Sequence, residues 1–414
     1  MTQLLLIILF YVAFVYLLYR GNRNSKNSLT ITELALAFAF KCALGFLYGY
    51  IFLVYFGGDD TWYFHNGSIE EQQKLLNNPK QFLADFNPQP AFVMQETFSL
   101  GLYYYLSDLE FWLISKPMAL LNFITKGNYY LNSMLFNFFA IWGQIWLFRL
   151  FIKEFPSSRK IVLIVLFFIP PLVFWLSGIR GDGYLFLFLA LALLYFYKWI
   201  KEKKASYLLY VFLGFAGIMI FRSVILFLLI PALLAWAISA RTAVNAWVST
   251  GIVYVICLVV FFGSTLVSSN KNFPNLIVKR QAQFFSLKGN TRYSLDTLQP
   301  NFSSFIRTLP QAANNSLLRP YVWEARGPLQ WLSAAEVLGF LVLILFLLWR
   351  KVNEWETHFR NPLIVFSIVF AVSLMLFIGY VIPFPGAIVR YKVPAEMLLI
   401  LALSTAIRWK LRSN

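Results

Sequence analysis

Long, almost uncharged apolar runs constrain this chain more than any other feature of its sequence. A helix needs about 20 mostly apolar residues to cross the hydrocarbon core of a bilayer, and runs of that kind recur along the whole chain. Only 13% of the residues are charged, against about 25% in soluble domains. The sequence therefore predicts an all-α polytopic membrane protein rather than an unusually apolar soluble one. The eleven expected spans are 3–19, 31–56, 129–152, 161–177, 183–200, 206–221, 223–239, 244–266, 331–349, 362–382 and 393–408.

Basic residues in the short loops predict the orientation. Nearly half of the 35 Lys and Arg residues fall in the segments 20–30, 153–160, 198–205, 240–243, 350–360 and 408–414. Cytoplasmic loops carry an excess of such residues, and these segments alternate correctly if the N-terminus is outside and the C-terminus is cytoplasmic. The net charge of +17 is then explained by the basic loops on one membrane face and not by binding to nucleic acid. The short spans 206–221 and 223–239 could instead form one broken helix, which would change the count.

We expect a single transmembrane domain over 1–414, with two large outer loops at 57–128 and 267–330. The first loop mixes aromatic and apolar residues with Asp, Glu, Pro and Lys, a composition typical of amphipathic helices that lie at the membrane interface. A further span near 109–125 would break the charge alternation. The N-terminal run "MTQLLLIILFYVAFVYLLYR" has neither a basic start nor a small-residue cleavage site, so we expect a retained anchor.

Charged side chains gather at the predicted outer ends of the spans, where water meets lipid. A carboxylate there can deprotonate an attacking hydroxyl, and guanidinium groups can hold a departing phosphate. This combination suits transfer from a phosphate-linked lipid whose tail stays in the bilayer. The residues concerned are Asp59 and Asp60 in "YFGGDDTWYFHNG", Arg180 and Asp182 in "SGIRGDG", and Arg222, Arg390 and Lys392.

Simpler interpretations of these residues stay open. The two adjacent acids could be a solvated helix end, Arg180 and Asp182 could pair within their loop, and the basic residues at 390 and 392 could reach lipid phosphates. Of the two acids, we expect Asp59 to be catalytic and Asp60 to cap the next helix. Lys41, inside a span, must face the bundle or a cavity. The aromatic neighbours Trp62 and His65 suit sugar binding or an interfacial belt.

The composition limits metal and disulfide chemistry. The chain has two cysteines and two histidines, too few for a disulfide framework or a His-rich metal site. Asp59, Asp60 and Asp182 could together offer oxygen ligands to Mg²⁺ or Mn²⁺. The cofactor is otherwise unknown.

Three motifs together resemble the GT-C superfamily of polytopic glycosyltransferases, which use polyprenyl-phosphate-linked sugars. They are "GGDDTWY", "PPLVFWLSGIRGDGYLFLFLALALLYFYKW" and "GAIVRYKVPAEMLLILAL". The resemblance implies that Asp59 or Asp60 is the general base or an acid that positions the acceptor, and that Asp182 is a second acid at the site. It also implies that Arg222 and Arg390 are phosphate ligands. Gly181 departs from the pattern, because Lys often stands there in the family.

The expected function is therefore transfer of a sugar from a polyprenyl-phosphate carrier to a glycan acceptor on the outer face. The expected location is the bacterial inner (plasma) membrane, with the active site facing the periplasm or exterior and membrane lipids as partners. The first and third motifs also occur loosely in Wzy-type polysaccharide polymerases, which is one alternative. A lipid-linked glycan flippase or transporter is another, although the sequence shows no internal repeat of the kind transporters carry.

Overall fold

The computed structural model describes residues 2–25, 27–86, 98–242, 244–267, 272–289, 291–349 and 355–407. Throughout these ranges the regular structure is helical, without strands. The chain divides into two compact units, 1–226 and 227–414. Each unit is described by itself below.

The first unit carries the helices from α1 to α11. Their starts follow local sequence signals: Thr30 and Glu33 form a reciprocal capping box at the start of α2, and Asn128 caps α7. The bounds are α1 Thr2–Asn22, α2 Ile31–Val54, α3 Asp60–Asn77, α4 Pro79–Ala84, α6 Phe98–Thr125, α7 Tyr129–Glu154, the 3₁₀ turn η1 Pro156–Ser158, α8 Arg159–Phe167, α9 Pro170–Trp175, α10 Gly181–Glu202 and α11 Ser206–Arg222.

The second unit begins within α12 and carries the remaining helices. Asn side chains cap three of them, from Asn272, Asn301 and Asn361. The bounds are α12 Val224–Arg241, α13 Ala246–Val267, α14 Phe273–Ser286, α15 Phe302–Ala313, the π-helical turn η2 Asn314–Leu318, the 3₁₀ turn η3 Val322–Glu324, α16 Pro328–Trp349, α17 Trp355–Phe359, α18 Pro362–Val381, α19 Pro385–Tyr391 and α20 Val393–Ser404.

Eight helices of the described chain are long and apolar enough to cross a membrane, so the chain is an all-α, multi-pass membrane protein. Two further apolar helices, α11 and α20, are shorter. The break between α11 and α12 falls at Ser223. The eight are Gln3–Asn22, Ile31–Val54, Tyr129–Glu154, Gly181–Glu202, Val224–Arg241, Ala246–Val267, Pro328–Leu347 and Pro362–Val381.

The segment 161–177, expected as one span, is instead two short helices. Helix α8 ends at Phe167, and α9 begins at Pro170. Pro170 and Pro171 cause the break, because proline has no N–H to donate and disfavours helical geometry in the residue before it. Ile169 accordingly has an extended backbone. The expectation of a continuous helix there is wrong.

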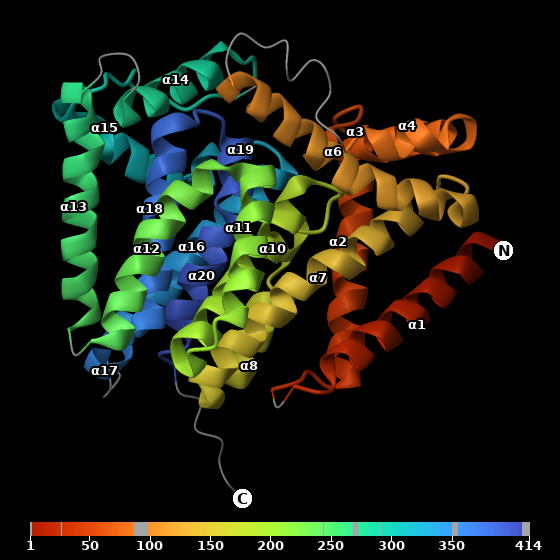
Figure 1. Cartoon of the computed structure of the whole chain (residues 1–414), viewed down its shortest axis with the longest axis horizontal. Coiled ribbons are helices and arrows are strands. Elements are labelled where there is room, and N and C mark those ends of the chain that lie inside the picture. The colour runs from red at the N-terminus through yellow and green to blue at the C-terminus, as the bar shows by residue number, and fades with distance from the viewer. Residues whose placement is uncertain are drawn as a thin grey trace, which may run out of the picture. The chain divides into compact units, whose positions relative to one another are not determined.

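Within the first unit, α7 packs against both α2 and α10 (Figure 1). Small residues allow these close approaches. A Cβ added at Gly45 of α2 would lie 2.7 Å from the Asn137 side chain, and one at Gly143 of α7 would lie 2.8 Å from the backbone of Leu187. Lys41 is 1% exposed and donates a hydrogen bond to the Leu176 carbonyl at 3.0 Å, as expected for a bundle-facing cation.

The segment 57–128 folds as α3, α4 and α6, with residues 87–97 outside the described ranges. A buried cation joins these helices. Lys116 of α6 is 3% exposed and binds Glu71 of α3 at 2.5 Å and Asp85, just after α4, at 2.9 Å. This segment is therefore a packed part of the first unit and not a flexible connection. The segment 267–330 contains α14, α15 and the two short turns, within the second unit.

Candidate functional site

The acidic pair Asp59 and Asp60 of the motif "YFGGDDTWYFHNG" lies at a sharp turn between α2 and α3. Gly57 and Gly58 have φ angles of +67° and +103°, a backbone conformation that favours glycine. The turn they form ends α2 and places Asp59 at the N-cap position of α3. Asp59 makes no side-chain capping bond, and Asp60 lies in the first helical turn. The expectation that Asp60 caps this helix is therefore wrong, because its carboxylate is drawn to a cation instead.

That cation is Arg180, which binds both acids. One Nη of its guanidinium donates to Asp59 and the other to Asp60. The first Nη also donates to the hydroxyl of Tyr48 at 2.9 Å. The Arg180 side chain is only 3% exposed, whereas those of Asp59 and Asp60 are 29% and 56% exposed. A buried guanidinium thus presents two carboxylates at the surface.

Burial lowers the pKa of the Arg180 guanidinium, but Tyr48, Asp182 and the two acids of the motif together raise that pKa well above its usual range. Arg180 is therefore a permanent positive charge at this end of the first unit. The position of this charge is set by the loop sequence, because Arg180 immediately precedes α10.

Hydrogen bonds hold the turn that carries Arg180 against α3. The backbone N–H of Ile179 donates to the hydroxyl of Thr61 at 3.1 Å. The Thr61 hydroxyl is 2.7 Å from the hydroxyl of Tyr129 on α7, and Thr61 is fully buried. On the other side of the turn, Asn137 donates to the carbonyl of Ser177 at 2.9 Å. These bonds fix the turn from both sides.

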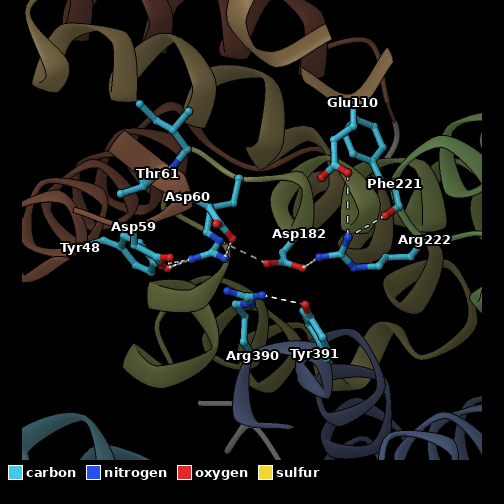
Figure 2. Close-up of polar contacts among 12 residues, drawn as sticks. Tyr48, Asp59, Asp60, Thr61, Glu110, Asp182, Phe221, Arg222, Arg390 and Tyr391 are labelled. Carbon is cyan, nitrogen blue, oxygen red and sulfur yellow. Dashed lines mark hydrogen bonds and ion pairs between the residues drawn. The ribbon is translucent and has the colours of Figure 1, made fainter. Parts of the chain in front are cut away.

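A second arginine extends the network. Asp182, in the first turn of α10, lies 3.8 Å from Nε of Arg180 and 3.6 Å from Nη2 of Arg222. Arg222 is the last residue of α11 and also lies 3.9 Å from the carboxylate of Glu110 on α6. Figure 2 shows Arg222 reaching toward both Asp182 and Glu110. Three predicted site residues on separate segments, Asp59, Asp182 and Arg222, therefore belong to one network through Arg180.

Glu110 is the member of this network that the sequence did not identify. Burial raises the pKa of its carboxyl to about 7, Arg222 opposes this, and Asp182 and Asp60 add to it. The only signal in the sequence is an acid within the largely apolar stretch "LEFWLIS". Nothing in that stretch points to a partner on α11.

The aromatic neighbours lie deeper than the acids. The Trp62 ring stacks on Tyr129 with centroids 4.3 Å apart, and its Nε1 donates to the Gly49 carbonyl at 3.0 Å. His65 is 3% exposed, and its Nδ1 is 3.3 Å from the amide nitrogen of Asn132. Burial lowers the pKa of His65 to about 4, so the ring is neutral at physiological pH. The structure thus places His65 in the interior, whereas Trp62 is half-buried.

Arg390 and Lys392 belong to the second unit. Arg390, on α19, donates to the hydroxyl of Tyr391 at 2.8 Å (Figure 2). Lys392 is 1% exposed and lies 3.3 Å from the carboxylate of Glu396, which is also buried. The Lys392 ammonium is therefore held inside its own unit. That Arg390 joins the acids of the first unit stays a prediction.

The acids do not fit a divalent cation. In the described ranges, no group of three or more His, Cys, Asp or Glu side chains is arranged to hold a metal ion. Asp59, Asp60 and Asp182 each lie against a guanidinium, and a metal would have to displace or face those positive charges.

The arrangement is an open chain of alternating charges, and Asp60 is its most accessible carboxylate. It can accept a proton at a carboxylate and can offer guanidinium groups to an anion.

No protein-family model matches the chain, and neither a curated protein nor a solved structure is similar to it.

Proposed function

We propose that this protein is a membrane glycosyltransferase that moves a sugar from a polyprenyl-phosphate carrier to a hydroxyl acceptor. The observation that supports it most is the buried Arg180, which holds the partly exposed carboxylates of Asp59 and Asp60. Such a site offers a base and an anion-binding group side by side, at the ends of membrane-spanning helices. A lipid-linked phosphate with its tail in the bilayer is a substrate suited to that place.

The transfer needs one base and one phosphate-binding group. The acceptor oxygen attacks the anomeric carbon of the sugar, the bond from that carbon to the phosphate oxygen breaks, and the acceptor proton passes to a carboxylate. The polyprenyl phosphate leaves with the bonding electrons and is stabilised by a guanidinium. Arg222 suits this role, because its side chain is 32% exposed and its carboxylate partners lie at 3.6 and 3.9 Å.

Between the two adjacent acids, we assign the base to Asp60. Its side chain is 56% exposed, so a bulky acceptor can reach the carboxylate even while that carboxylate binds Arg180 from the first turn of α3. Asp59 is less exposed and holds Arg180 from the N-cap position. This reverses the order expected from the sequence, since that order depended on Asp60 being the cap.

The finer topology is part of the proposal. We place the N-terminus outside, the C-terminus in the cytoplasm and the site on the outer face of a bacterial inner membrane, as the loop charges indicate. Cysteines introduced beside Arg20 and Lys201 should react with an impermeant maleimide only after permeabilisation. Labelling of both cysteines in intact cells would show that the orientation is the reverse of the proposed one. Of the loop charges used for this argument, those at 26, 350–354 and 408–414 lie outside the described residues.

The activity is tested with purified protein in nanodiscs, a glycan acceptor with free hydroxyls and a panel of polyprenyl-phosphate hexoses and pentoses. We expect release of polyprenyl phosphate from at least one donor by the parental protein and at least a 100-fold slower release by Asp60→Asn, since a general base contributes on the order of 10²–10⁴-fold. Glu356→Gln, at an exposed acid of α17 in the second unit, is the control and should keep the parental rate. Equal rates for Asp60→Asn and the parental protein would refute the assigned base.

A further inference from the structure

Glu110 occupies space that a glycine leaves open. A Cβ placed on Gly181 would lie 2.0 Å from Oε1 of Glu110 and 3.0 Å from its Cδ. The carboxylate therefore packs directly on the backbone between Arg180 and Asp182. Its side chain is only 18% exposed. Any other residue at 181 would displace it, so the glycine and the acid form one structural feature.

The charge balance of the network opposes an anionic ligand. Within the described residues of the first unit, the network sets four carboxylates against two guanidinium groups. If all are ionised the sum is negative, and a phosphate diester would meet repulsion in a site of low dielectric. Uptake of a proton by one carboxylate reduces that repulsion. The four are Asp59, Asp60, Asp182 and Glu110, and the two are Arg180 and Arg222.

Geometry distinguishes Glu110 from the other three acids. Asp59 and Asp60 are hydrogen-bonded to Arg180. Asp182 lies between the two guanidinium groups. Glu110 is offset to one side, and its ion pair with Arg222 is the longest in the network at 3.9 Å.

The charged groups that face Glu110 come from three packed elements. They are Asp60 on α3, Asp182 on α10 with Arg180 just before it, and Arg222 on α11. Helix α7 also packs against α6, but its charged residues lie in its last two turns. Burial among these groups raises the pKa of Glu110 to about 7, so its proton can be gained or lost under physiological conditions.

We propose that Glu110 takes up one proton when the anionic donor binds, and that Arg222 then exchanges Glu110 for the donor phosphate. Glu110 is a positioning residue in this scheme, since it acts through Arg222. The proton comes from solvent and converts the carboxylate to a carboxylic acid, so that the arriving negative charge is matched by one positive charge. The inference rests on the proposed function and assigns it a regulation by pH.

The test measures binding of farnesyl methyl phosphate, whose phosphodiester keeps a single negative charge from pH 5.5 to 8.5. Parental protein in phosphatidylcholine nanodiscs should bind with constant affinity below about pH 7 and lose up to tenfold per pH unit above it. Glu110→Gln, an isostere of the protonated acid, should bind with a Kd that does not change with pH and lies within about threefold of the parental value at pH 5.5. Asp108→Asn, at an exposed acid of the same helix, should keep the parental pH dependence.

Proton uptake is measured independently on the parental protein. Calorimetric titration at pH 8 in buffers of different ionisation enthalpy should show uptake of close to one proton per bound diester, even if the Glu110→Gln protein fails to fold. Parental affinity that is constant with pH, uptake near zero, or a folded Glu110→Gln protein that keeps the pH dependence would overturn the inference about Glu110. Parental protein that does not bind the diester at any pH would instead overturn the proposed phosphate site, and with it both proposals.

Discussion

Replacing Thr61 by valine tests whether the turn carrying Arg180 is held by the bonds described above. Valine keeps the shape of threonine but removes the hydroxyl, which leaves the Ile179 N–H and the Tyr129 hydroxyl without this partner in a fully buried place. An unsatisfied buried polar group costs about 1–3 kcal/mol. Two such groups, partly relieved by local movement, should lower the stability of the first unit by about 2–4 kcal/mol.

The same change should slow transfer. Arg180 is the next residue after Ile179, and a shift of about 1 Å in a positioned group can cost on the order of 10²-fold in rate. Thermal unfolding of the protein in nanodiscs and release of polyprenyl phosphate are the two assays. Thr61→Ser keeps the hydroxyl and is the matched control, with near-parental values expected in both.

A double variant makes the reasoning refutable. Thr61→Val combined with Tyr129→Phe also removes the Tyr129 hydroxyl that the valine leaves without its partner. The destabilisation of the double variant should therefore be smaller than the sum of the two single changes. Strictly additive losses would show that the two hydroxyls do not act on each other. Parental stability for Thr61→Val would show that the turn is held by other contacts, and the positioning argument would be lost.

Three further outcomes are expected. Asp59→Asn should slow transfer less than Asp60→Asn, because an amide can still accept a hydrogen bond from Arg180; the reverse order would return the base to Asp59. Arg180→Lys should slow transfer at least tenfold, because one ammonium cannot bind both acids in the forked geometry of a guanidinium; a parental rate would contradict this. The neutral His65 has a pKa lowered to about 4, so stability present above about pH 6.5 should be lost as the pH falls toward 4, by up to about 3 kcal/mol. His65→Gln should lose less than the parental protein in urea unfolding over that range.

The positions of most membrane helices could be predicted, because length and apolarity are local properties. The expected span 31–56 corresponds to α2 at Ile31–Val54, and 129–152 corresponds to α7 at Tyr129–Glu154. The prediction failed at 161–177 because apolar character outweighed the proline pair at 170 and 171. A hydropathy pattern does not reflect the backbone N–H that proline lacks, whereas a continuous helix depends on that hydrogen-bond donor.

The candidate site was predictable by residue type but not by pairing. The sequence indicated the helix ends at which charged residues lie, namely Asp59, Asp60, Arg180 and Asp182. That Asp59 and Asp60 share one guanidinium depends on how α3 and the turn before α10 come together, and no local pattern records that. Glu110 was missed for the same reason. The space that its carboxylate occupies exists only because Gly181, on a distant segment, lacks a side chain.

Buried cations show why burial alone does not separate structural from functional charges. Lys41, Lys392 and Arg180 are 1%, 1% and 2% exposed. The partner of Lys41 is a backbone carbonyl, and that of Lys392 is the buried Glu396. Arg180 differs because its carboxylate partners reach the surface. A ligand can compete for a cation only where the groups that hold it can move into solvent. By this criterion Arg180 can take part in binding, whereas the partners of Lys41 and Lys392 stay buried.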